Sequence, residues 1–170
     1  MDKYFAVGIP AGALNDEDYR YFYVAGNILG IKYITYRLWS YFLGGNTIEN
    51  AISDPAFSAY NDPNGLQSII GDMIREGLII TENRIEEYIP LRYGIGTGYQ
   101  NDGSYLIYTD QPHKLPQLSY VIWLFSDGRN TFEDIINRLH KLDIEASEKE
   151  IKEAISLLLA EATLFLSQEA

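Results

Sequence analysis

The spacing of apolar residues along the chain predicts six short helices in two groups of three. Apolar side chains recur every three or four positions in each, which places them on one helical face. Thr131 with Asp134, and Ser147 with Glu150, also have the spacing of a capping box at a helix start. The predicted helices are Ile34–Phe42, Thr47–Ser53, Pro63–Glu76, Leu118–Phe125, a segment that follows Thr131, and Glu148–Ala162.

Strand patterns precede each group of helices. Tyr19–Ala25 and Ser104–Thr109 are rich in aromatic and β-branched residues, which favours strands. Leu78–Ile80 and Ile85–Ile89 flank a polar segment and predict two strands joined by a turn. Gly94–Gly98 superficially resembles a phosphate-binding loop, but it lacks the Lys-Ser/Thr of that loop and no helix follows directly. We expect a flexible strand or a bulge there.

Two segments of the chain share residues that chance similarity between amphipathic helices does not explain. Tyr36–Ile52 and Tyr120–Ile136 align without a gap at an offset of 84 (120 − 36). The shared residues include both tryptophans of the chain, a glycine, an Asn-Thr pair and a glutamate. We therefore predict an α+β fold formed by tandem duplication of a winged-helix-like unit, each with a small antiparallel sheet and three helices. The predicted units are residues 1–84 and 85–170.

Composition narrows the possible functions. The chain has 170 residues, no cysteine and a net charge of −11. Disulfides and thiolate metal sites are therefore excluded, and a nucleic-acid backbone would be repelled unless the few bases cluster. No run approaches the roughly 18 apolar residues of a membrane span, and the N-terminus lacks the pattern of a signal peptide. We expect a cytoplasmic protein that does not bind membranes.

Candidate catalytic groups are sparse. The only histidines are His113, in a proline-flanked loop, and His140, near the end of a charged helix, and we expect both at the surface. Their spacing does not fit a zinc site. Glu86 and Glu87 are typical of a solvated face, since a catalytic carboxylate pair needs a cleft. We expect no enzymatic activity, no cofactor and no metal.

Direct nucleic-acid binding is disfavoured by the third helix of each unit. A recognition helix presents Arg, Lys, Asn or Gln to the bases. Here acids and bases are mixed on the exposed faces, which carry Gln67, Ser68, Asp72, Arg75 and Glu76 in the first unit and Lys149, Glu150, Lys152 and Glu153 in the second. We therefore expect nucleic acid not to be the partner.

The second predicted unit carries a short family motif. Asp127, Gly128, Thr131, Asp134 and Ile135 follow its first helix, and a capped apolar helix comes later. With the preceding strands, this arrangement over residues 88–166 resembles the PqqD-like fold, also called the RiPP precursor peptide recognition element. The first unit matches more weakly, at Gly44, Gly45, Thr47, Asn50 and Ala51.

The resemblance implies peptide binding by strand addition to a sheet edge, beside the third helix. Carried over to this chain, it places the edge strand at Tyr105, Leu106, Ile107 and Tyr108, and the groove wall at Lys152, Ile155 and Ser156. In the first unit the equivalents are Tyr21–Val24, including Tyr21 and Tyr23, with Ile70 and Arg75. Because the chain is acidic, we expect a neutral or basic peptide, or a binding edge whose local charge differs from the average.

Three functions follow from these patterns. The first is a non-enzymatic module that binds a peptide or protein partner, such as a precursor peptide in a peptide-modification system. An alternative is a winged-helix transcriptional regulator or its accessory subunit. A second alternative is a structural homo-oligomer, such as a homodimer, in which the many tyrosines pack subunits or units together.

Overall fold

The protein has an α+β fold, as the sequence predicts. The computed structural model describes residues 2–12, 18–60 and 62–168. The chain divides into two compact units, which we call unit 1 (residues 1–87 with 168–170) and unit 2 (residues 88–167). The division after Glu87 lies three residues beyond the predicted boundary at residue 84.

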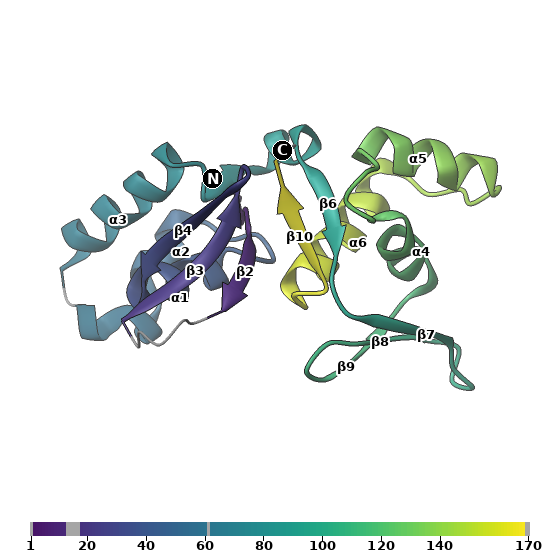
Figure 1. The fold of residues 1–170 in the computed structure, drawn as a ribbon, viewed down its shortest axis with the longest axis horizontal. Helices are drawn as coiled ribbons and strands as arrows, with labels where there is room; N and C mark the ends of the chain where they lie inside the picture. Colours follow the sequence, from purple (N-terminus) through teal and green to yellow (C-terminus); the bar gives the residue numbers. More distant parts are fainter. Residues whose placement is uncertain (1, 13–17, 61, 169–170) are drawn as a thin grey trace. The chain divides into compact units, whose positions relative to one another are not determined.

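Unit 1 contains five strands, three α-helices and two 3-10 helices among its described residues (Figure 1). In chain order they are β1 (Tyr4–Ala6), β2 (Ile9–Gly12), β3 (Tyr19–Val24), β4 (Asn27–Lys32), α1 (Tyr33–Tyr41), α2 (Ile48–Ser53), η1 (Pro55–Tyr60), α3 (Pro63–Arg75), β5 (Ile79–Thr81) and η2 (Glu82–Glu87). The strands β2, β3 and β4 form an antiparallel sheet with β3 in the middle, and β1 pairs with β5.

Over its described residues 88–167, unit 2 has the same order of strands and α-helices, without the 3-10 helices. Its elements are β6 (Ile89–Arg92), β7 (Ile95–Tyr99), β8 (Tyr105–Tyr108), β9 (Pro112–Leu115), α4 (Gln117–Phe125), α5 (Phe132–Lys141), α6 (Glu148–Ala160) and β10 (Leu164–Ser167). The strands β7, β8 and β9 form an antiparallel sheet with β8 in the middle, and β6 pairs with β10. The pairing of β7 with β8 shifts between Gly96 and Gly98, which is the bulge expected in the glycine-rich segment.

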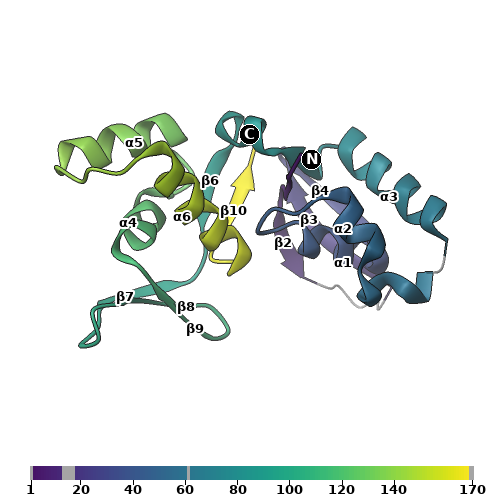
Figure 2. The same cartoon turned by 180° about the vertical axis from the view of Figure 1, so that it is seen from behind.

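The inner face of the unit 1 sheet packs against the first helix. Figure 2 shows α1 and α2 on one side of this sheet. Phe22 of β3 is fully buried, and its ring lies 4.5 Å from that of Trp39 on α1. The alternation of side chains along a strand therefore sends Tyr21 and Tyr23 to the opposite, outer face.

Residues shared by the two predicted repeats hold the same positions in each unit. The indole Nε1 of Trp39 donates to the Val7 carbonyl at 2.7 Å. That of Trp123 is shared between the Tyr93 carbonyl at 3.2 Å and the Thr163 carbonyl at 3.0 Å. Each tryptophan also stacks on the tyrosine three residues earlier in its helix, with interplanar angles of 16° and 23°. These bonds tie the first helix of each unit to the segment that joins its first two strands.

The predicted helix starts are confirmed by the capping contacts. The Thr131 side chain accepts a bond from the Asp134 backbone N–H, and the Asp134 carboxylate accepts one from the Thr131 N–H. Ser147 and Glu150 form the same reciprocal pair at the start of α6. These contacts satisfy donors that the helix cannot satisfy internally.

The predicted strand pair between Leu78 and Ile89 is wrong. Residues 79–81 form β5, but Glu82–Glu87 form a 3-10 helix, and β6 begins at Ile89. β5 pairs with β1 and β6 with β10, so no hairpin forms between them. Alternating apolar residues indicate strands, but the pairing partner depends on contacts far away in the sequence.

Candidate peptide-binding edges

The strands predicted as binding edges are central strands, so this prediction is wrong. Tyr105–Tyr108 form β8, which pairs with both β7 and β9. Tyr21–Val24 lie in β3, which pairs with both β2 and β4. The backbone of a central strand is already hydrogen-bonded on both sides, so it has no room for a further strand. The edges beside them are β2 and β4 in unit 1 and β7 and β9 in unit 2. The pairing of β7 with β8 is interrupted by the shift between Gly96 and Gly98, and the corresponding third strands β4 and β9 are compared below.

The hydrogen-bonding pattern between β3 and β4 shows which backbone groups face away from the sheet. The turn between them has two residues, Ala25 and Gly26, with φ of 48° and 78°, so the flanking Val24–Asn27 pair is hydrogen-bonded. Bonded and non-bonded pairs alternate along an antiparallel ladder. The Tyr33 N–H donates to the Asp18 carbonyl at 2.9 Å, as this alternation requires.

The non-bonded positions of β4 are therefore Ile28, Gly30 and Lys32. Their partners across the ladder are Tyr23, Tyr21 and Tyr19, in that order. At non-bonded positions the backbone N–H groups point away from the neighbouring strand. This edge of unit 1 thus presents three N–H groups at alternate positions, which is the pattern that an added antiparallel strand uses.

Apolar side chains accompany these groups. Ile28 is 69% exposed on the outer face, and Leu29 is 38% exposed on the inner face beside Phe22. β4 contains no proline, and Lys32 is its only charged residue. Edge strands are usually protected by prolines, bulges or several charges. The six residues of β4 contain no proline, form no bulge with β3 and carry one charge.

The opposite edge of the same sheet is protected. Pro10 of β2 pairs with Phe22, whose own backbone groups are bonded to β4, so the missing N–H of Pro10 is on the outward side. The pairing of β2 with β3 also shifts between Pro10 and Gly12. A bulge and a proline make this edge a poor template for a further strand.

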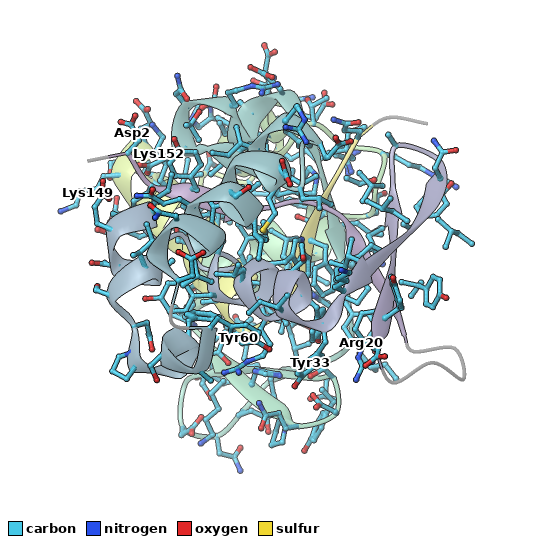
Figure 3. The ribbon with its side chains drawn as sticks, turned by 90° about the vertical axis from the view of Figure 1, so that its left-hand side faces the viewer. Asp2, Arg20, Tyr33, Tyr60, Lys149 and Lys152 are labelled. Carbon is cyan, nitrogen blue, oxygen red and sulfur yellow. The ribbon has the colours of Figure 1, made fainter. Side chains whose placement is uncertain are left out.

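The charge around β4 differs from that of the rest of the chain. Residues 19–48 contain Arg20, Lys32 and Arg37 and no acid, a charge of +3. The remaining residues therefore carry −14 (−11 − 3). Figure 3 shows Arg20 beside Tyr33, and the guanidinium carbon lies 5.1 Å from the centre of the ring. This stretch of sequence is therefore basic, and Asp18, whose carbonyl accepts the Tyr33 N–H, lies directly before it at the end of the ladder.

The residues predicted for the groove wall of unit 2 are neighbours on α6 but differ in exposure. Lys152 Nζ donates to Glu148 Oε1 at 2.6 Å on the same helix. Ile155 is 6% exposed and belongs to the core, whereas Ser156 is half-buried. A buried Ile155 cannot form the wall of an open groove.

The corresponding residues of unit 1 also have other roles. Ile70 is 1% exposed and is part of the core. Arg75, at the end of α3, forms ion pairs with Asp72 at 2.7 Å and Glu76 at 3.5 Å. These two acids neutralise the only base in the last turn of α3. The arrangement gives no support to a DNA-reading face on this helix.

His113 is buried, which corrects the prediction that it lies at the surface. It is 5% exposed, and its Nδ1 lies 2.7 Å from Glu161 Oε2. Its Nε2 lies 2.8 Å from Thr109 Oγ1, which in turn donates to Asp110 Oδ1 at 2.9 Å. These four residues help to line a pocket of about 430 Å³ in unit 2. Glu161 follows α6 in the sequence, so the bond fastens β9 to the end of that helix.

This carboxylate–imidazole–hydroxyl arrangement also occurs in hydrolases. In those enzymes the hydroxyl gives its only proton to the imidazole. Here Thr109 Oγ1 gives that proton to Asp110, so the hydroxyl is not poised to be activated by His113. We therefore assign the four residues a structural role in holding β9.

The described residues give no sign of a metal site or a membrane span. In residues 2–12, 18–60 and 62–168, no group of three or more His, Asp or Glu side chains is placed to hold a metal ion. Within the same ranges, no helix combines the length and the apolar character needed to cross a bilayer.

Comparison with known proteins adds no further identification. The chain matches none of the protein-family models and none of the curated proteins with which it was compared. The candidate site therefore rests on the geometry of the chain's own residues.

One sequence signal for β4 was available. Gly26-Asn27 follows the strand at Tyr19–Ala25, and Ile28, Leu29 and Ile31 come next. Turn residues followed by a second apolar run indicate a hairpin. Had this hairpin been predicted, Tyr19–Ala25 would have had a neighbouring strand on that side and would not have been assigned as the edge there.

Proposed function

We propose that this protein binds an extended peptide segment, which adds as a strand to the β4 edge of unit 1. The observation that carries the proposal is the set of outward N–H groups at Ile28, Gly30 and Lys32, on an edge without proline or bulge. Backbone bonds would supply affinity, and the exposed side chains of Ile28 and Leu29 would supply apolar contacts.

The local charge supports a particular ligand. Residues 19–48 hold three bases and no acid, so a segment that alternates acidic and apolar residues fits this edge. Each exposed ion pair contributes about 0.2–1 kcal/mol. One such pair at Lys32 would favour an acidic over a neutral peptide by up to about fivefold.

The resemblance to the PqqD-like fold supports the same class of function. Each unit places a three-stranded antiparallel sheet before three helices, and the predicted capping motif is present in unit 2. A precursor peptide or a segment of a protein partner would satisfy the same edge. On this proposal the two units arose by duplication of one ancestral unit, and the activity is binding without catalysis.

The proposal is tested by selecting ligands from a displayed library of random peptides against the full chain. We expect the enriched peptides to alternate apolar and acidic residues. The variant Ile28→Pro, which lacks one outward N–H, should bind these peptides more weakly than wild type. Ile28→Val is the matched control, because it retains the N–H and the β-branched shape. If enriched peptides bind the proline variant as tightly as wild type, β4 is not the binding edge.

A second candidate uses the same edge for self-association. Two copies of β4 could pair antiparallel around a two-fold axis, since the outward groups of Ile28 and Lys32 would be satisfied by the same strand of the other copy. Sedimentation velocity distinguishes this homodimer from a monomeric peptide-binding protein. A dimer that Ile28→Pro converts to monomer would favour self-association as the function of the edge.

A further inference from the structure

The β9 edge of unit 2 holds the position that β4 holds in unit 1. Each is the third strand of its meander and leads directly into the first helix. The buried central residues pair in the same way, with Phe22 opposite Leu29 in unit 1 and Ile107 opposite His113 in unit 2. The residues of the two edges can therefore be compared one by one.

The outward positions of β9 can be assigned from its proline. Pro112 pairs with Tyr108, and because proline has no N–H this must be a non-bonded pair. The outward positions are then Pro112, Lys114 and, just beyond the strand, Pro116. They correspond to Ile28, Gly30 and Lys32 of unit 1.

Two of the three outward N–H groups of unit 1 are thus missing in unit 2. Proline removes the donor at both ends of the row, and only Lys114 retains one. The Lys114 ammonium is held by Asp102, with Nζ 2.5 Å from Oδ2. Pro116 has almost the same backbone angles as Lys32, with φ/ψ of −61°/156° and −62°/151°. The two edges therefore differ in their donors while the backbone at this position is the same.

The inner side of the β9 edge is also closed. Leu29 of unit 1 is 38% exposed, whereas His113 at the corresponding position is 5% exposed and bonded to Glu161 and Thr109. In unit 1 the glutamate after the third helix, Glu76, forms its ion pair with the neighbouring Arg75. An apolar Leu29 side chain cannot form such a bond to the helix end.

We propose that the β4 edge of unit 1 accepts a peptide, and that the corresponding β9 edge of unit 2 is closed to strand addition by Pro112, Pro116 and the His113–Glu161 bond. This inference rests on the proposed function, because it asks which of two corresponding edges performs it. The β9 edge of unit 2 then provides no second copy of this site, and the β4 edge binds one peptide segment.

The test maps the bound edge in the unaltered full chain. A peptide enriched from the displayed library is titrated into isotope-labelled protein, and backbone amide shifts are followed by NMR. We expect one peptide per chain, with the largest shifts in residues 27–32 and none in residues 113–115. Shifts in residues 113–115, alone or with those in 27–32, would overturn the inference but leave strand addition intact. Absence of binding by any enriched peptide would refute the proposed function itself.

A variant that carries unit 1 residues in unit 2 then tests whether Pro112, His113 and Pro116 close the β9 edge. The triple variant Pro112→Ile, His113→Leu and Pro116→Lys gives unit 2 the residues of unit 1, and we expect the stoichiometry to rise from one to two. His140→Leu, at an exposed histidine of the same unit, is the control and should leave one site. A folded triple variant that still binds one peptide would show that these residues do not close the edge. If the triple variant does not fold, the double variant Pro112→Ile and Pro116→Lys is used, which restores both missing N–H groups, and we expect peptide-dependent shifts to appear at residues 112–115.

Discussion

Lys32→Pro is a sharp test of strand addition because the folded protein should accept it. Lys32 has φ of −62° and ψ of 151°, and the proline ring fixes φ near −65°. The preceding Ile31 is in an extended strand, which is the conformation favoured before proline. The Lys32 N–H faces outward, so its removal breaks no bond to β3. Pro116 already occupies the corresponding position in unit 2 with the same angles.

The expected loss of affinity follows from one backbone hydrogen bond. A hydrogen bond contributes about 0.5–1.5 kcal/mol net, and 1.4 kcal/mol corresponds to a factor of ten. Lys32→Pro should therefore weaken binding of an enriched peptide by about 2- to 10-fold. Steric contact between the proline ring and the added strand would increase this loss.

The assay is fluorescence anisotropy with a labelled peptide enriched from the displayed library. Lys32→Gln is the matched control, because it removes the charge but keeps the N–H. We expect its loss to be smaller and to vanish at high salt, whereas the loss in Lys32→Pro should persist. Unchanged affinity in a folded Lys32→Pro variant, or equal losses in both variants at high salt, would refute the reasoning.

Three further predictions concern stability, each measured by urea denaturation. Gly71→Ala should stabilise unit 1 by about 0.5–1 kcal/mol, because Gly71 lies inside α3 and an added Cβ meets nothing within 4 Å; a loss of stability would contradict this. Ala162→Gly should stabilise unit 2 by up to about 1 kcal/mol, because Ala162 has φ of 50°, and no gain would mean that this backbone carries no strain. Thr131→Ala should destabilise unit 2 by about 1 kcal/mol at pH 7 through loss of the cap. The Thr131 backbone N–H and hydroxyl hold the pKa of Asp134 below its usual range, so this stabilisation is present above the unfolded-state pKa and is lost as pH falls through the lower folded-state pKa. The difference between Thr131→Ala and wild type should therefore shrink at acid pH, and a constant difference would contradict the account.

The sequence predicted those parts of the fold that depend on neighbouring residues. Helix starts at Thr131 and Ser147 follow from side chains three residues apart, and the structure contains both capping boxes. The strands around Phe22 and Ile107 follow from local alternation. The repeated Trp39 and Trp123 are explained by their equivalent bonds to a backbone carbonyl. Each of these features depends on residues that are close together in the sequence, or on a residue that occurs at the same position in both units.

The candidate site could not be predicted in this way, because an edge is defined by what lies on both sides of a strand. Tyr105–Tyr108 has a strong strand pattern, but that pattern is the same for a central and an edge strand. His113 is buried because Glu161, 48 residues away in the sequence, bonds to it. No local spacing indicates such a contact.

The most direct test of strand addition is the detection of contacts between backbone protons of a bound peptide and those of β4. Isotope-filtered NMR on the full chain, with a peptide enriched from the displayed library, measures these contacts. The account predicts cross-strand contacts at Ile28 and Gly30, together with slowed exchange of their amide protons. A peptide that binds without contacts at β4, with these amides still exchanging as in the free protein, would contradict the account.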